Sequence, residues 1–193
     1  MRTFKRLCIY CGSSQRVGER YLECARQVGA RIAERGIGVV YGGGNVGLMG
    51  ALANAALAAD GEVVGVIPER LRVREVAHEG VTELLVTHTM QERKRKMADL
   101  ADAFIALPGG WGTLEEIFEV TTLTQLGYHE KPVGMLNAHG YYDPLIAFLH
   151  HAADEGFIRQ QHRGLIVTAT DFEELIDAMA VCELPEPGPH VLR

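Results

Sequence analysis

Residues 103–116 read AFIALPGGWGTLEE. The run Ala103–Leu107 is continuously apolar, as expected for a strand that is covered on both faces of a sheet. Pro108–Thr113 contains three glycines, which is typical of a tight turn, and Leu114–Gln125 is a helix candidate. The stretch therefore predicts a strand that passes through a glycine-rich turn directly into a helix.

The rest of the chain repeats this order of strand and helix, the pattern of βαβ units around a parallel sheet. Strands are expected at Arg6–Cys11, Gly38–Tyr41, Val63–Ile67, Glu83–Val86, Ala103–Leu107 and Pro132–Leu136. Helices are expected at Arg20–Arg35, Leu48–Asp60, Met90–Leu100, Leu114–Gln125, Pro144–Glu155 and Phe172–Ala180. No repeat, linker or low-complexity block interrupts the sequence, so residues 1–193 are predicted to form one α/β domain. Residues 184–193, with three prolines and a glycine, are expected to be an irregular tail.

Composition and charge narrow the class of protein. Hydrophobic residues make up 47% of the chain and charged residues 23%, the balance of a globular protein. The formal net charge of −6 predicts no general attraction to nucleic acid or to an anionic membrane, so a nucleotide would need a local positive site. Apolar runs such as Ala51–Ala59 are too short to cross a bilayer, and the first residues show no signal-peptide cleavage site. A cytoplasmic protein without nucleic-acid or membrane partners is expected.

Cys8 and Cys11 form a Cys-x-x-Cys pair, which can indicate a redox pair or half of a zinc site. Both fall on the expected strand Arg6–Cys11, and residues three apart on a strand face opposite sides of the sheet. The sequence contains no second such pair, and the histidines show no convincing metal-ligand spacing. We therefore expect reduced cysteines, no metal and no cofactor.

Glycine- or serine-rich turns follow three of the expected strands, at Cys11–Ser14, Tyr41–Gly47 and Pro108–Thr113. Ligands bind at the carboxyl edge of an open parallel sheet. Glycine lets backbone N–H groups approach an anion closely, and the start of a helix adds a favourable dipole. Three such turns on one edge favour a ligand that contains phosphate. Its candidate contacts outside the third turn are Ser14, Gly43 and Gly44.

Gly42-x-Gly44-x-x-Gly47 also matches the dinucleotide-binding fingerprint, so an NAD(P)-dependent oxidoreductase is an alternative. That fingerprint requires an acidic residue about twenty positions on, at the end of the next strand. Glu62 has the right separation but precedes the strand Val63–Ile67, and Glu69 follows that strand only after a proline. The motif also follows the second expected strand rather than the first. Dinucleotide binding is therefore the weaker interpretation.

The expected helix Met90–Leu100 carries a charged residue on an apolar face. Its residues Met90, Arg93, Met97 and Leu100 share one stripe at three- and four-residue spacing. A buried guanidinium is costly unless it is paired. We therefore expect Arg93 to meet a carboxylate, a phosphate or both.

Glu116 fits two interpretations. In the first, Thr113-Leu114-Glu115-Glu116 is a capping box, in which Thr113 caps the helix and Glu116 folds back onto its first turn. In the second, Glu116 projects from a glycine-lined helix start toward the sugar of a nucleotide. An arginine that needs an anion favours the second interpretation slightly, and the cap stays open as an additional role.

Several motifs together resemble one known family. Pro108–Glu116 has the form PGGxGTxxE, and residues 90–94 have the Met-x-x-Arg-Lys form found upstream of it. With Tyr41–Gly44 and Gly47–Gly50, they look like the Lonely Guy (LOG) family of cytokinin riboside 5′-monophosphate phosphoribohydrolases, long labelled possible lysine decarboxylases. The resemblance covers residues 7–180, and the combination is far more specific than any one glycine turn.

The resemblance implies a Rossmann-like, doubly wound sheet with helices on both faces, and usually a homodimer. The implied reaction is hydrolysis of the N-glycosidic bond of an N6-modified adenosine monophosphate (AMP), giving a free base and ribose 5-phosphate; AMP itself is a substrate of many members. Carried over residue by residue, the catalytic pair is Arg93 and Glu116. The nucleotide-contacting positions are this pair and Glu75, Lys94, Gly110, Trp111, Gly112, Thr113, Leu114, Glu115 and Thr122.

The residues support a mechanism for that reaction, which passes through an oxocarbenium-like state. Backbone N–H groups of Gly110–Thr113 can hold the phosphate. Glu116 can stabilise positive charge near C1′ and act as base toward water, and Arg93 can keep Glu116 ionised, since an adjacent cation favours a charged carboxylate. A nucleotide sensor or carrier without hydrolysis is a further alternative. The decarboxylase label gains no support, because no lysine lies in a convincing pyridoxal phosphate setting.

Overall fold

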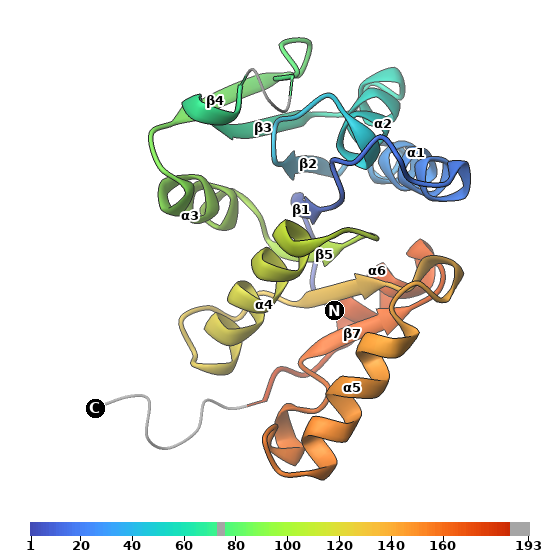
Figure 1. Ribbon diagram of the computed structural model, residues 1–193, viewed down its shortest axis with the longest axis vertical. Helices are drawn as coiled ribbons and strands as arrows, with labels where there is room; N and C mark the ends of the chain where they lie inside the picture. Colours follow the sequence, from blue (N-terminus) through green and yellow to red (C-terminus); the bar gives the residue numbers. More distant parts are fainter. Residues whose placement is uncertain (73–75, 186–193) are drawn as a thin grey trace.

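The computed structural model describes residues 1–72 and 76–185. Within them the strands form one parallel sheet in the order β4-β3-β2-β1-β5-β6-β7 (Figure 1). The strands are β1 Arg6–Tyr10, β2 Gly38–Tyr41, β3 Val63–Pro68, β4 Glu83–Thr87, β5 Ala103–Ala106, β6 Val133–Leu136 and β7 Ile166–Ala169. The helices are α1 Glu19–Glu34, α2 Gly47–Ala58, α3 Met90–Leu100, α4 Trp111–Gln125, α5 Asp143–Asp154 and α6 Phe172–Val181. Short 3-10 turns lie at Glu69–Leu71, Ala138–Gly140 and Gln160–His162.

The predicted α/β fold is confirmed: each expected strand and helix is present, and its ends differ from the prediction by at most three residues. The prediction missed β7, a strand of four residues at the edge of the sheet. Its side chains are half-buried or exposed, so its sequence lacks the continuous apolar run that marked the buried strands. The expected irregular tail lies largely outside the described residues, since only its first two positions are described.

Helices cover both faces of the sheet, as a doubly wound fold requires (Figure 1). The first core lies between the sheet and α1, α2 and α6; the second lies between the sheet and α3 and α4, with part of α5. Side chains of β1 alternate between them, since Leu7 and Ile9 belong to the first core and Tyr10 to the second. Among the described helices, none combines the length and apolar character needed to cross a membrane.

The two cysteines of the Cys-x-x-Cys pair enter different cores. Cys8 lies in the second core and Cys11 in the first, which confirms that they face opposite sides of the sheet. Both are free thiols. Burial raises the pKa of both thiols well above the usual range, so both stay protonated at neutral pH.

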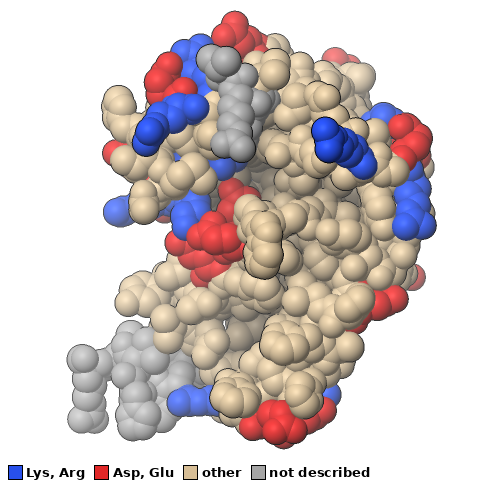
Figure 2. Space-filling view, in the orientation of Figure 1, with Lys and Arg blue, Asp and Glu red and all other residues tan. Residues whose placement is uncertain are grey.

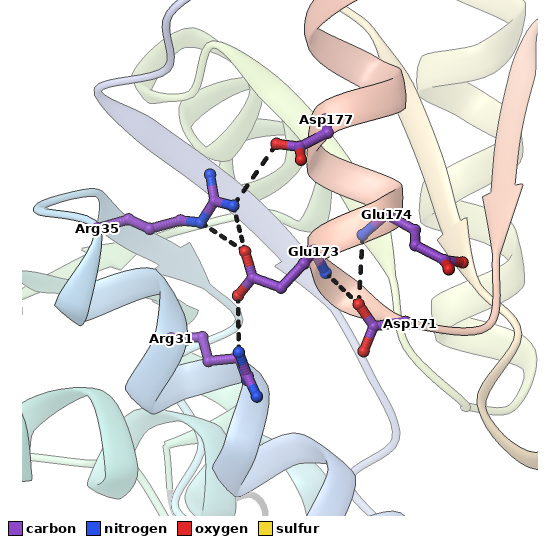
Figure 3. A network of polar contacts seen from close by, with 6 residues as sticks. All are labelled: Arg31, Arg35, Asp171, Glu173, Glu174 and Asp177. Carbon is purple, nitrogen blue, oxygen red and sulfur yellow. Dashed lines mark hydrogen bonds and ion pairs between the residues drawn. The ribbon is translucent and has the colours of Figure 1, made fainter.

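An ion-pair network connects α6 to α1 (Figure 3). Glu173 of α6 accepts from Arg31 at 3.0 Å and also pairs with Arg35, which lies 3.5 Å from Asp177. Asp171 caps α6 by accepting from the backbone N–H groups of Glu173 and Glu174, at 2.8 and 3.3 Å. Exposed pairs of this kind contribute at most about 1 kcal/mol each, so the apolar contacts of the first core carry most of the stability of this layer.

From β1 the chain adds β2, β3 and β4 toward one edge of the sheet, and then returns to add β5, β6 and β7 toward the other edge. β1 and β5 therefore lie side by side at the point where this order switches. In open α/β sheets, ligands bind outside the carboxyl ends of the strands at such a switch point. Here the turns after the two strands meet: Gly12 N–H donates to the Pro108 carbonyl at 3.1 Å. The turn after β2 joins them, because Leu48 N–H donates to the Gly12 carbonyl at 2.9 Å. The fold thus brings all three predicted glycine turns to one edge.

Candidate active site

A cleft of about 250 Å³ opens at this switch point. It is lined by residues 9–14 at the end of β1 and in the turn after it, by Gly42 after β2, by Met49 of α2, by Met90 and Arg93 of α3, and by residues 110–113, 115 and 116 at the start of α4. Of the predicted site residues, the cleft therefore gathers Ser14, Arg93, Gly110, Trp111, Gly112, Thr113, Glu115 and Glu116.

Arg93 reaches the cleft from the apolar stripe of α3. A capping box formed by Thr89 and Glu92 sets the start of this helix, and Arg93 and Met97 are its buried residues. The Arg93 side chain donates from Nε to the Val66 carbonyl at 3.0 Å and from Nη2 to the Gly42 carbonyl at 3.1 Å. The guanidinium is therefore held by backbone from β3 and from the turn after β2.

Glu116 approaches Arg93 from α4. Arg93 Nη1 and Glu116 Oε1 lie 3.7 Å apart, and the two side chains are 7% and 11% exposed. The expectation that the buried arginine meets a carboxylate is confirmed. The two charges compensate each other in a largely buried setting, and the residual exposure of Glu116 lies in a cleft that it lines.

Gly42 is a site residue whose role the sequence did not reveal. A Cβ atom at this position would lie 2.2 Å from Arg93 Nη2, so only glycine lets the guanidinium approach the Gly42 carbonyl. The sequence does show three consecutive glycines after β2, but we interpreted Gly42 as part of a dinucleotide-binding fingerprint and not as a position that accommodates an arginine. Met49 and Met90, which also line the cleft, gave no chemical signal at all.

The capping box predicted for Thr113 is wrong. α4 begins at Trp111 rather than Leu114, and its N-cap is Gly110, with no side-chain cap. Thr113 is the third residue of the helix and is 4% exposed, packed so closely that a Cβ at Gly109 would lie 2.1 Å from its hydroxyl oxygen. The glycines allow the helix to begin earlier, and the threonine packs beneath the turn instead of capping.

The start of α4 has the properties of an anion site. The first N–H groups of any helix have no partner within the helix, and here no capping side chain accepts from them. Their residues line the cleft, and the helix dipole adds positive potential. A Cβ at Gly110 or Gly112 would meet no protein atom within 4 Å. Packing within the protein therefore does not require glycine at these two positions. A ligand that closely approaches the backbone would require it.

Lys94 connects α3 to α4 beside the cleft without lining it. Its Nζ lies 2.5 Å from Glu115 Oε1 and 3.1 Å from Glu119 Oε1. Burial opposes the charge, but the two carboxylates outweigh it and raise the pKa of Lys94. Figure 2 shows basic and acidic side chains meeting between the two helices. Together with Arg93 and Glu116, these contacts fix the relative position of the helices that form the site.

Other predicted residues lie apart from the cleft. Gly43 and Gly44 bond instead to residues 77 and 78: the Gly43 carbonyl accepts from His78 N–H at 2.9 Å, and Gly44 bridges Ala77. Thr122 lines a second cleft of about 180 Å³ between α4 and α5, and its hydroxyl donates to the Phe118 carbonyl. Leu114 is not a lining residue. Glu75 lies outside the described residues.

The floor of the cleft is neutral. Burial, with a smaller contribution from the charge of Glu116, raises the pKa of Cys11. Burial also raises the pKa of Tyr10, whose ring stacks on Phe104 with centroids 6.2 Å apart. In the described part of the chain, no three His, Cys, Asp or Glu side chains gather closely enough to hold a metal ion. Among the described residues, the ionised groups that line the cleft are thus those of α3 and α4.

Comparison with known proteins agrees with this architecture. Residues 49–179 match the family model described as possible lysine decarboxylase. The chain is 49% identical over 173 residues to the cytokinin riboside 5′-monophosphate phosphoribohydrolase LOG of Oryza sativa subsp. japonica, covering 90% of this chain and 72% of that protein. It is 50% identical over 173 residues to LOG7 of Arabidopsis thaliana, which carries the same enzyme name, covering 90% and 80%.

A solved structure with the same fold is the molybdenum cofactor binding protein from Rippkaea orientalis. Its TM-score is 0.68 at 25% identity, over 92% of this chain and 95% of that one. The likeness confirms the Rossmann-like architecture. The much higher identity to the plant proteins, together with the family model, places the sequence more narrowly: this chain belongs to the LOG family.

Proposed function

We propose that this chain hydrolyses the N-glycosidic bond of cytokinin riboside 5′-monophosphates, releasing a free base and ribose 5-phosphate. The observation that carries the proposal is the buried pair of Arg93 and Glu116 beside the glycine-lined start of α4. The relatives at 49% and 50% identity, which bear the name of this enzyme, support the same activity.

The 5′-phosphate would bind at the start of α4. Trp111, Gly112 and Thr113 offer first-turn N–H groups to the cleft, and the helix dipole favours a dianion there. Backbone donors need no proton transfer and no reorganisation when the ligand arrives. Ser14 lines the same cleft from the turn after β1 and would face the phosphate from the opposite side.

The carboxylate of Glu116 would act at the sugar. As the bond between C1′ and the base nitrogen breaks, the base leaves with the electron pair and takes up a proton from the solvent, and positive charge develops at C1′. A water oxygen bonds to C1′ from the other face, and its proton passes to Glu116 as general base. The position of Glu116, buried yet lining the cleft, suits both the electrostatic and the proton-transfer role.

The main role of Arg93 would be to orient the carboxylate of Glu116. Two backbone carbonyls hold its guanidinium, so its position is set before a ligand binds. A fixed cation 3.7 Å from Glu116 favours the ionised form of the carboxylate and restricts its direction. The catalytic pair is thus preorganised by β2, β3 and α3 together.

The base would lie against the rim of the cleft. Trp111 is 90% exposed and Met90 is 39% exposed, and both line the cleft. An indole beside a purine can stack on it, and an exposed methionine suits an apolar N6 substituent. The same pocket would accept AMP, which lacks the substituent, so we propose AMP as a second substrate. A contact between Thr122 and the nucleotide stays a prediction that this cleft does not explain.

Two further proposals rest on the family. We propose a homodimer, which size-exclusion chromatography with light scattering would test at enzyme concentrations used for assays. We also propose a cytoplasmic location, which cell fractionation would test.

Incubation with isopentenyladenosine 5′-monophosphate, AMP and adenosine, followed by chromatography of the free base, tests the proposed reaction. Both monophosphates should release base, and adenosine should release little because it lacks the phosphate. Saturable binding without base release would instead favour a nucleotide sensor or carrier. Hydride transfer with NAD(P) would favour the oxidoreductase alternative.

A further inference from the structure

Three consecutive carbonyl groups precede the start of α4, and each accepts a hydrogen bond from elsewhere in the chain: two from the segment between β6 and α5, and one from the turn after β1. The Leu107 carbonyl accepts from the Tyr142 hydroxyl at 2.7 Å. The Pro108 carbonyl accepts from Gly12 N–H at 3.1 Å. The Gly109 carbonyl accepts from the Tyr141 hydroxyl at 2.7 Å. All three oxygens, which would repel a phosphate, are therefore occupied by donors of the protein.

The last of these bonds controls the direction of a donor. In a trans peptide the C=O and the N–H point in opposite directions, so a Gly109 carbonyl held toward Tyr141 turns Gly110 N–H away from Tyr141. Gly110 lines the cleft and Tyr141 does not. The Gly110 N–H therefore points to the cleft side of the turn.

The residue types on either side of this peptide group do not fix its orientation. It joins two glycines, which have the widest choice of backbone angles, and a Cβ at Gly110 would contact nothing within 4 Å. Packing against the turn does not hold Gly110, so the hydrogen bond from Tyr141 helps to fix the peptide plane from the side opposite the cleft.

We propose that Tyr141 is a positioning residue for phosphate binding: its hydroxyl holds the Gly109–Gly110 peptide in the orientation that presents Gly110 N–H to the substrate phosphate. The inference rests on the proposed function for the identity of the ligand. It assigns a role to a residue outside the cleft, in the segment between β6 and α5.

The surroundings of Tyr141 suit this role. Its ring packs edge-on against Tyr21 at 5.6 Å and against Tyr142 at 4.9 Å, so the hydroxyl has a defined position. The neighbouring Tyr142 is 2% exposed, and its N–H donates to Asn137 Oδ1 at 2.7 Å. Tyr141 itself is 40% exposed, so loss of its hydroxyl leaves the core intact.

Tyr141→Phe keeps the ring and removes the bond. Calorimetric titration should show ribose 5-phosphate binding about fivefold to tenfold more weakly, since one hydrogen bond and the fixed orientation of a second donor are lost. Adenosine, which carries no phosphate, should bind both proteins equally. In the hydrolysis assay KM for AMP should rise by the same factor while kcat stays within about twofold. Tyr128→Phe, at a 73% exposed position outside the cleft, is the matched control.

The inference is overturned if Tyr141→Phe binds ribose 5-phosphate as tightly as the wild type, if adenosine binding weakens equally, or if kcat falls while KM is unchanged. Wild-type protein that does not bind ribose 5-phosphate would also overturn it. Wild-type protein that binds ribose 5-phosphate but releases no base would refute the proposed hydrolysis alone, and the binding comparison would still decide the role of Tyr141.

Discussion

Arg93 Nη1 lies 3.7 Å from Glu116 Oε1, and neither side chain is more than 11% exposed. The arginine is held by a carbonyl of β3 and by a carbonyl of the turn after β2, whereas the glutamate belongs to the helix that begins at the glycine turn. One buried pair thus connects the sheet edge, α3 and α4. Fixed placement of this kind is what the proposed catalytic role requires.

Gly42→Ala should disrupt this pair. The added methyl group would lie 2.2 Å from Arg93 Nη2, so the guanidinium must move and lose its bond to the residue 42 carbonyl. We expect base release from AMP to fall by about tenfold or more, because displaced catalytic groups lose rate steeply. Gly18→Ala is the control, since a Cβ there meets no atom within 4 Å. Equal activity of the two variants would show that the position of Arg93 is not critical.

Gly112→Ala should separate stability from binding. Alanine within a helix is favoured over glycine by about 1 kcal/mol, and no protein atom obstructs its methyl group. Urea unfolding should therefore show equal or higher stability than the wild type. The methyl group would nevertheless occupy the cleft, so KM for AMP should rise severalfold. An unchanged KM would place the phosphate elsewhere.

Trp111 provides a direct signal for the base, because it is the single tryptophan of the chain. Its side chain is 90% exposed, so stacking on a purine should change its fluorescence. AMP added to the Glu116→Gln variant should quench or shift the emission, while ribose 5-phosphate should have little effect. If both ligands give the same change, the indole senses the phosphate or the loop rather than the base.

The sequence predicted the sheet, its edge and a charged partner for Arg93 because each left a local pattern. The strands are continuous apolar runs, and the arginine interrupts an apolar helical stripe at Arg93. The sequence did not predict β7, which is short and only partly buried. Nor did it predict where α4 begins, because Thr113 with Glu116 three residues later has the spacing of a capping box. The structure instead places the N-cap at Gly110 and packs Thr113 against Gly109.

Contacts between distant segments were beyond the reach of sequence patterns. The approach of Arg93 to Gly42 joins residues 51 positions apart, and the bond from Tyr141 to Gly109 joins residues 32 apart. Neither pair shares a motif or a periodicity. Gly43 and Gly44 stay untested as phosphate contacts: they do not line the cleft, and they bond to residues 77 and 78 of their own chain.

Buried histidines should make the protein less stable in mild acid. Burial lowers the pKa of His78 and of His162 below the ordinary value near 6.5. The unfolded chain therefore takes up protons first as pH falls through 6.5, and the free energy of unfolding should decrease from pH 7.5 to 5.5. His162→Gln should reduce this dependence, whereas His150→Gln, at an exposed position, should not. Equal stability at the two pH values would contradict the prediction.

The most direct test of the central claim is the rate of base release by Glu116→Gln compared with the wild type, using isopentenyladenosine 5′-monophosphate and AMP. Glutamine keeps the size of the side chain but can neither accept the proton nor stabilise positive charge at C1′. Loss of a general base typically costs about 100-fold or more, so we predict a fall of at least that size with ribose 5-phosphate binding preserved. A folded Glu116→Gln protein that releases base within about twofold of the wild-type rate would contradict the account.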